Sequence, residues 1–113
     1  MEDVLSAVIA TRDASPKARR EQLAPYADRA GIGRMFTYAL AGRETRAMLR
    51  AILDVSSSPG VAEIAAHYLE IHRDQLPALL FAEDAKVRKS TAQLLGKIAP
   101  TAWADLLLEA LRR

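Results

Sequence analysis

The stretch 81–98 constrains the fold of this chain most strongly, because its apolar residues recur at helical spacing. Aliphatic side chains at Val87, Leu94 and Leu95 fall on one face of an α-helix. The opposite face carries polar side chains at Lys86, Lys89, Gln93 and Lys97. The pattern predicts an amphipathic helix that buries one face against other helices. It indicates an architecture and no particular chemistry.

Composition extends this expectation to the whole chain. Of its 113 residues 50% are hydrophobic and 5% are aromatic, and β-branched residues form no runs. Alanine and leucine favour helix over strand, and small side chains let helices pack closely. The sequence therefore predicts a single all-α domain over residues 1–113, built from about eight short helices.

Proline, glycine and small polar residues are expected to separate these helices. Ser15 is expected to cap the second helix, with Pro16 in its first turn. Pro25 must kink that helix or start a new turn, and glycines 31 and 33 are expected to end the segment. Asp74 is expected to cap the sixth helix. Further helices are expected at about 2–12, 43–55, 60–72 and 101–112.

Several classes of protein are excluded or disfavoured. The chain has no cysteine, which excludes disulfides, thiolate metal sites and cysteine nucleophiles. No apolar run approaches the roughly 18 residues that a membrane span needs. Residues 1–5 are acidic where a signal peptide would be basic. We therefore expect a cytoplasmic protein with no membrane partner.

The chain also contains an internal repetition. The apolar pattern of 76–80 recurs over 103–107, which lies 27 positions further along the chain. A repeat of about this length, with two antiparallel helices in each unit, is typical of an α-solenoid. The succession Val87-Arg88, Leu95-Gly96 and Ile98 resembles the second helix of a HEAT-type repeat.

The HEAT-type resemblance covers residues 74–112, and its first helix corresponds to 76–80. The resemblance implies a right-handed α-α superhelix of antiparallel helix pairs. It also implies that Asp84, in the turn between two helices, and Arg88 hold adjacent repeat units together. In such a stack the helix expected at 101–112 lacks a partner, so we expect the chain to be a fragment of a longer protein. A C-terminal cap that folds back onto an earlier helix is the alternative.

Two stripes of basic residues are the main candidates for a binding surface. They lie on helix faces that the apolar residues leave free, at Arg43, Arg46, Arg50, Lys86, Lys89 and Lys97. Second helices line the concave surface of a solenoid, so both stripes could face one ligand there. A phosphate backbone suits such spaced charges, although any helix exposed to water also needs charged residues.

A second constellation, Glu63, His67 and Glu70 with His72 nearby, combines carboxylates and imidazoles on one helix. Such groups could bind a divalent cation or serve as an acid/base pair. Their spacing matches neither the His-Glu-x-x-His zinc helix nor the Glu-x-x-His motif of di-iron bundles. We therefore expect ion pairs on a solvated face, and neither a metal nor a cofactor.

These observations predict a non-enzymatic HEAT-like helical scaffold that mediates protein–protein interaction. The alternative is a nucleic-acid-binding accessory module of a larger modifying enzyme, with basic helix faces on phosphates. A free-standing enzyme built on this surface, as in some HEAT-like DNA-repair glycosylases, is a third hypothesis. The sequence contains no evident site for a small-molecule substrate.

Overall fold

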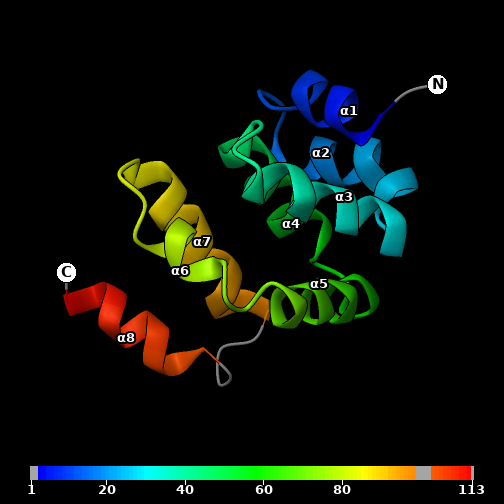
Figure 1. Cartoon of the computed structure of the whole chain (residues 1–113). Helices are drawn as coiled ribbons and strands as arrows, with labels where there is room; N and C mark the ends of the chain where they lie inside the picture. Colours follow the sequence, from blue (N-terminus) through cyan, green and yellow to red (C-terminus); the bar gives the residue numbers. More distant parts are fainter. Residues whose placement is uncertain (1–2, 99–102, 113) are drawn as a thin grey trace.

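Residues 3–98 and 103–112, which a computed structural model describes, fold into helices joined by short turns (Figure 1). The α-helices are α1 (Val4–Ala10), α2 (Pro16–Leu23), α3 (Arg29–Leu40), α4 (Thr45–Val55), α5 (Pro59–Ile71), α6 (Leu76–Leu80), α7 (Ala85–Ile98) and α8 (Ala104–Arg112). A 3₁₀ turn, η1 (Ala24–Tyr26), directly follows α2. These two ranges contain no strand, so the all-α prediction is confirmed. The right-handed superhelix stays a prediction.

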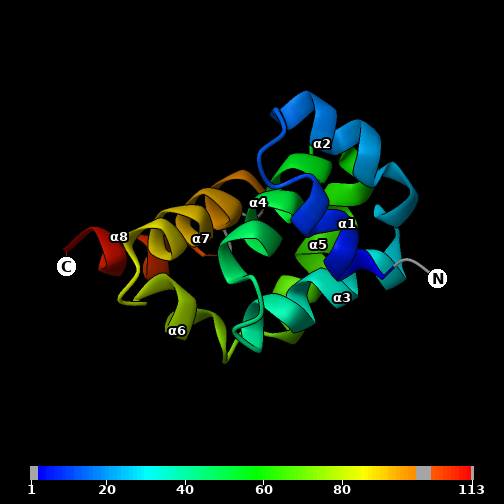
Figure 2. The same cartoon turned by 90° about the horizontal axis from the view of Figure 1, so that it is seen from above.

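Helix α4 lies at the centre of the helix packing (Figures 1 and 2). It packs against α1, α2 and α3, which precede it, and against α7, which follows it after two further helices. Met48, Leu49 and Ile52 of α4 are completely buried, as are Ile32 and Phe36 of α3. Burial of a side chain of this size contributes about 1.5–3 kcal/mol. The apolar face of α4 therefore joins the three helices that precede it to α7.

The predicted start of α2 is confirmed. Ser15 occupies the cap position, its Oγ accepts a hydrogen bond from the Ala18 amide at 3.2 Å, and Pro16 opens the helix. Pro25 starts a new turn, because it lies inside η1. The first turn of α3 is capped by Asp28, whose carboxylate accepts a hydrogen bond from the Gly31 amide at 2.7 Å.

The prediction that Gly31 and Gly33 end a helix is wrong, since both lie inside α3. A Cβ at Gly31 would lie 1.9 Å from the carbonyl oxygen of Tyr26, and a Cβ at Gly33 would lie 2.7 Å from the hydroxyl of Tyr68. Glycine permits such close approach because it has no side chain. These two glycines thus serve tertiary packing against η1 and α5.

The prediction that Asp74 caps the sixth helix is also wrong. Helix α6 begins at Leu76, and Gln75 occupies its cap position. The chain already turns before this point, because the amides of Gln75 and Leu76 both donate to the carbonyl of His72, at 2.9 and 3.2 Å. Asp74 therefore lies within that turn, one residue too early to cap the helix.

Helix α8 packs against α7. Trp103, just before α8, is 2% exposed, and the guanidinium of Arg73 lies 4.7 Å from the centroid of its ring. The side chains at 106 and 107, expected on the same apolar face, lie outside the described part of the chain, as do residues 101 and 102. Across the described residues, every helix is too short or too polar to pass through a lipid bilayer.

Candidate anion-binding groove

A groove of about 570 Å³ lies between α4, α7 and the turn that follows α1. We refer to this cavity as the basic groove. Arg12 and Asp13 line it from the turn after α1. Its second wall belongs to α4 and the preceding residue, with Glu44, Arg46, Ala47 and Arg50. Its third wall belongs to α7, with Lys86, Lys89, Ser90 and Gln93.

Helical periodicity places the cations of the groove. On α4, Met48 and Leu49 point into the core, so Arg46 and Arg50 lie on the opposite face, where their side chains are 52% and 43% exposed. On α7, burial of Val87 and Leu94 leaves the lysines at 86 and 89 exposed in the same way. The contact between α4 and α7 then brings the two polar faces together.

The charge of the groove lining is positive but mixed. Five cations line it, at Arg12, Arg46, Arg50, Lys86 and Lys89, together with two carboxylates, at Asp13 and Glu44. Two of these cations have carboxylate partners outside the lining: Arg50 pairs with Asp54, as described below, and Arg46 Nη1 lies 4.0 Å from Asp84 Oδ2. The side chains of Arg46 and Asp84 are both about half exposed, so their pair contributes about 0–1 kcal/mol. An anion that draws Arg46 away from Asp84 would therefore cost the fold little stability.

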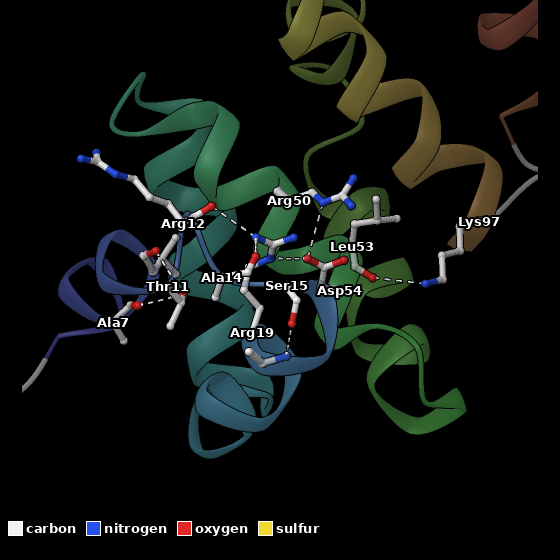
Figure 3. Close-up of polar contacts among 12 residues, drawn as sticks. Ala7, Thr11, Arg12, Ala14, Ser15, Arg19, Arg50, Leu53, Asp54 and Lys97 are labelled. Carbon is white, nitrogen blue, oxygen red and sulfur yellow. Dashed lines mark hydrogen bonds and ion pairs between the residues drawn. The ribbon is translucent and has the colours of Figure 1, made fainter.

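A buried ion pair supports two walls of the groove (Figure 3). Arg19 Nε donates to Asp54 Oδ2 at 2.5 Å, and these side chains are 9% and 7% exposed. Arg19 Nη1 also donates to the carbonyls of Arg12 and Ala14, at 3.2 and 2.5 Å. Arg50 Nε lies 3.5 Å from the same carboxylate oxygen of Asp54. The network thus ties the turn that carries Arg12 to α4, which carries Arg50.

Four of the six basic residues singled out from the sequence line the groove, namely Arg46, Arg50, Lys86 and Lys89. The other two have partners elsewhere. The guanidinium of Arg43 lies over the ring of Tyr38, 5.4 Å from its centroid. Lys97 Nζ donates to the carbonyl of Leu53 at 3.3 Å, near the C-terminal end of α4 (Figure 3).

Asp84 and Arg88 both lie at the start of α7. Asp84 Oδ1 accepts a hydrogen bond from the Lys86 amide at 2.8 Å and so caps this helix, while Oδ2 faces Arg46 of α4. Arg88 Nη1 donates to the carbonyls of Ala82 and Glu83, at 2.6 and 2.8 Å, in the turn before the helix. Their role between repeat units stays a prediction.

Sequence patterns alone did not single out Arg12, Asp13 or Glu44 as groove residues, because all three lie in turns outside the helical periodicity. Glu44 has a left-handed backbone, with φ 54° and ψ 43°, and follows Gly42, whose φ is 79°. The glycine at position 42 indicates a tight turn at this point, and it can be recognised in the sequence. The position of Asp54 within the buried run of α4 was a second available signal, because an acid at such a position needs a buried partner.

His67 and Glu70 of α5, and His72 directly after it, each contact a different set of neighbours. The ring of His67 packs edge-on against Tyr68, with centroids 5.6 Å apart, and Glu70 pairs with Arg73 at 3.1 Å. His72 stacks on Phe36 and Tyr68. Within the described residues, no three His, Asp or Glu side chains are placed to hold a metal ion together.

In comparisons with protein-family models, curated proteins and solved structures, nothing matches this chain. The HEAT-type resemblance over 74–112 therefore stays a prediction from the sequence, and function has to be inferred from the geometry of the basic groove.

Proposed function

We propose that this chain is a non-enzymatic helical interaction domain that docks a macromolecular partner through the basic groove. The observation that carries the proposal is the convergence of cations from three separate elements. Arg12 comes from the turn after α1, Arg46 and Arg50 come from α4, and Lys86 and Lys89 come from α7. Such a surface steers and orients an anionic partner, and gives specificity more than raw affinity.

The character of the lining favours a macromolecule over a small molecule. Sites for small molecules are mostly apolar and surround their ligand. Among the described lining residues, Ala47 is the one apolar side chain, and the side chains of Arg46 and Arg50 are 52% and 43% exposed. The groove therefore offers spaced charge along an open surface, which suits a segment of a larger anionic molecule.

A scaffold without catalysis is the simplest function for this lining. The groove offers one hydroxyl, from Ser90, and the histidines at 67 and 72 are not among its lining residues. A serine nucleophile needs a base within hydrogen-bond reach. The rings of Phe36, Tyr68 and His72 stack with one another, and none of these residues lines the groove.

We extend the proposal to a HEAT-type stack in a cytoplasmic protein. Contacts within the pairs α3–α4 and α6–α7 support this arrangement. The contact between α4 and α7, the second helices of these pairs, supports it further, because second helices line the concave surface of such a stack. The basic groove would then lie on that surface.

A nucleic acid is the second candidate for the partner. The number and spacing of the groove cations favour it, since phosphates need spaced charge more than specific contacts. In this case the chain would serve as the accessory module of a larger modifying enzyme.

Charge reversal in the groove tests the proposal. We expect the wild-type chain to bind fluorescent poly-L-glutamate or a single-stranded oligonucleotide, with affinity that falls steeply as salt is raised. Arg46→Glu combined with Lys89→Glu should weaken this binding by about tenfold or more, because two charge-assisted contacts of about 1 kcal/mol each are lost.

The matched control is Lys17→Glu combined with Arg20→Glu. These cations are exposed on α2 and lie outside the groove, and the net charge changes equally. Equal loss of binding in both double variants would show that net charge alone acts, and would overturn the proposal. Circular dichroism of each variant checks that the helices remain.

A further inference from the structure

We propose that the partner of the basic groove is an acidic polypeptide segment that also carries a basic residue, and that the groove discriminates against a continuous polyphosphate chain. This inference rests on the proposed function and specifies its partner. It is carried by the two carboxylates in the groove, Asp13 and Glu44, which a surface built solely for polyanions would not need.

Each carboxylate lies within two residues of a groove cation along the chain. Asp13 follows Arg12 in the turn after α1, and Glu44 precedes Arg46 by two residues at the start of α4. All four residues line the same cavity. The lining therefore presents both signs of charge along its rim, while Lys86 and Lys89 on the opposite wall add positive charge alone.

A mixed lining distinguishes between the two classes of partner. A nucleic acid carries a negative charge at every nucleotide, so a strand laid along the groove would bring phosphates near Asp13 and Glu44. Juxtaposed like charges act against the wrong partner, which is how interfaces reject competitors. A polypeptide can place carboxylates near Arg46 and Lys89, and a lysine or arginine near Glu44.

The backbone at Glu44 strengthens this argument. Its left-handed conformation, with φ 54°, is uncommon for a residue other than glycine, asparagine or aspartate. The fold holds it there, because the Arg43 amide donates to Tyr38 O at 2.9 Å and the Met48 amide donates to Glu44 O at 2.8 Å. A glutamate is thus kept at the rim of the groove at a position where glycine or asparagine would fit with less strain.

Glu44 also lies at the N-terminal end of α4, where a negative charge interacts favourably with the helix dipole. That effect would act on stability and would leave the choice of partner unchanged. A measurement of binding preference therefore separates the two roles, whereas a measurement of stability would not.

The test measures fluorescence anisotropy of the full chain with three labelled probes of equal length. One probe is an all-glutamate peptide, the second is a glutamate peptide with two lysines, and the third is a single-stranded oligonucleotide. We expect the lysine-containing peptide to bind about tenfold more tightly than the oligonucleotide at one ionic strength. In Asp13→Asn with Glu44→Gln, the oligonucleotide should bind more tightly and the lysine-containing peptide more weakly, which removes the preference.

The control is Glu21→Gln with Glu63→Gln, which removes two exposed carboxylates outside the groove. Tighter binding of the oligonucleotide to the wild-type chain would overturn the inference and identify nucleic acid as the partner. An unchanged preference in Asp13→Asn with Glu44→Gln would overturn it while the proposed function stands. Failure of all three probes to bind the wild-type chain would instead contradict the proposed function itself.

Discussion

The guanidinium of Arg19 lies 2.5 Å from the carboxylate of Asp54, and this buried pair joins α2 to α4. Arg19 also donates to two carbonyls of the turn that carries Arg12, and Asp54 lies 3.5 Å from Arg50. One buried network therefore supports residues on two walls of the basic groove, although neither Arg19 nor Asp54 lines it.

Loss of one partner of this pair should destabilise the fold strongly. Asp54→Ala leaves the Arg19 charge buried without compensation, and we expect the free energy of unfolding to fall by about 3–5 kcal/mol. Arg19→Met combined with Asp54→Leu should cost much less, because both charges are removed together. Urea denaturation followed by circular dichroism measures both. A loss below about 1 kcal/mol in Asp54→Ala would contradict the buried pair.

Two glycine-to-alanine substitutions should change the stability of the fold in opposite directions. Gly31→Ala places a Cβ against the backbone of Tyr26, which cannot yield as a flexible side chain can, so we expect a loss of about 1–3 kcal/mol. Gly96→Ala in α7 meets no atom within 4 Å, and alanine favours helix, so we expect a gain of about 0.5–1 kcal/mol. Thermal unfolding compares the two. Equal effects would contradict the close approach of η1 and α3.

The contact between Asp3 and Tyr38 should make stability depend on pH. Tyr38 Oη donates to Asp3 Oδ2 at 2.6 Å, and this hydrogen bond lowers the pKa of Asp3 below its ordinary value of 3.8. The contribution of a carboxyl with a lowered pKa is present above 3.8 and is lost as the pH falls through the lowered value. Tyr38→Phe should therefore flatten the loss of stability in this acid window, whereas Tyr26→Phe should not.

The same hydrogen bond should act at alkaline pH with the opposite sign. It raises the pKa of Tyr38 above its ordinary value of 10.0. The stability that it contributes is present below 10.0 and is lost as the pH rises through the raised value. Absorbance of the tyrosinate during an alkaline titration, compared between wild type and Asp3→Asn, measures the shift. A tyrosine titration that Asp3→Asn leaves unchanged would contradict the hydrogen bond.

Substitution of Arg43 or Lys97, which lie outside the groove, should lower stability and leave binding nearly unchanged. Lys97→Met removes the hydrogen bond to Leu53 O near the end of α4, and we expect a loss of up to about 1 kcal/mol in stability. Arg43→Ala removes the contact with the Tyr38 ring, and we expect a similar loss of stability. Both variants should bind poly-L-glutamate within about twofold of wild type. A tenfold loss of binding in either would extend the binding surface beyond the groove.

Local patterns in the sequence were sufficient for the all-helical fold and for the buried faces of several helices. The spacing of Met48, Leu49 and Ile52 predicted the inner face of α4, and Ser15 with Pro16 predicted the start of α2. These features depend on residues close together in the chain, where periodicity and capping preferences act. The same patterns also predicted which faces of α4 and α7 carry exposed cations.

Contacts between distant residues were decided by the tertiary structure. Gly31 and Gly33 break helices by intrinsic preference, yet in α3 their missing side chains admit Tyr26 and Tyr68, and packing outweighs that preference. Asp74 failed as a cap because the chain had already turned at His72.

The sequence by itself therefore determined an all-helical chain with two basic helix faces. The meeting of those faces with Arg12, and the mixture of charge at the groove, required α4 to pack against both α2 and α7. The physical reason is that a helix face follows from a local period, whereas the partner of that face depends on how side-chain shapes and charges from separate helices fit together.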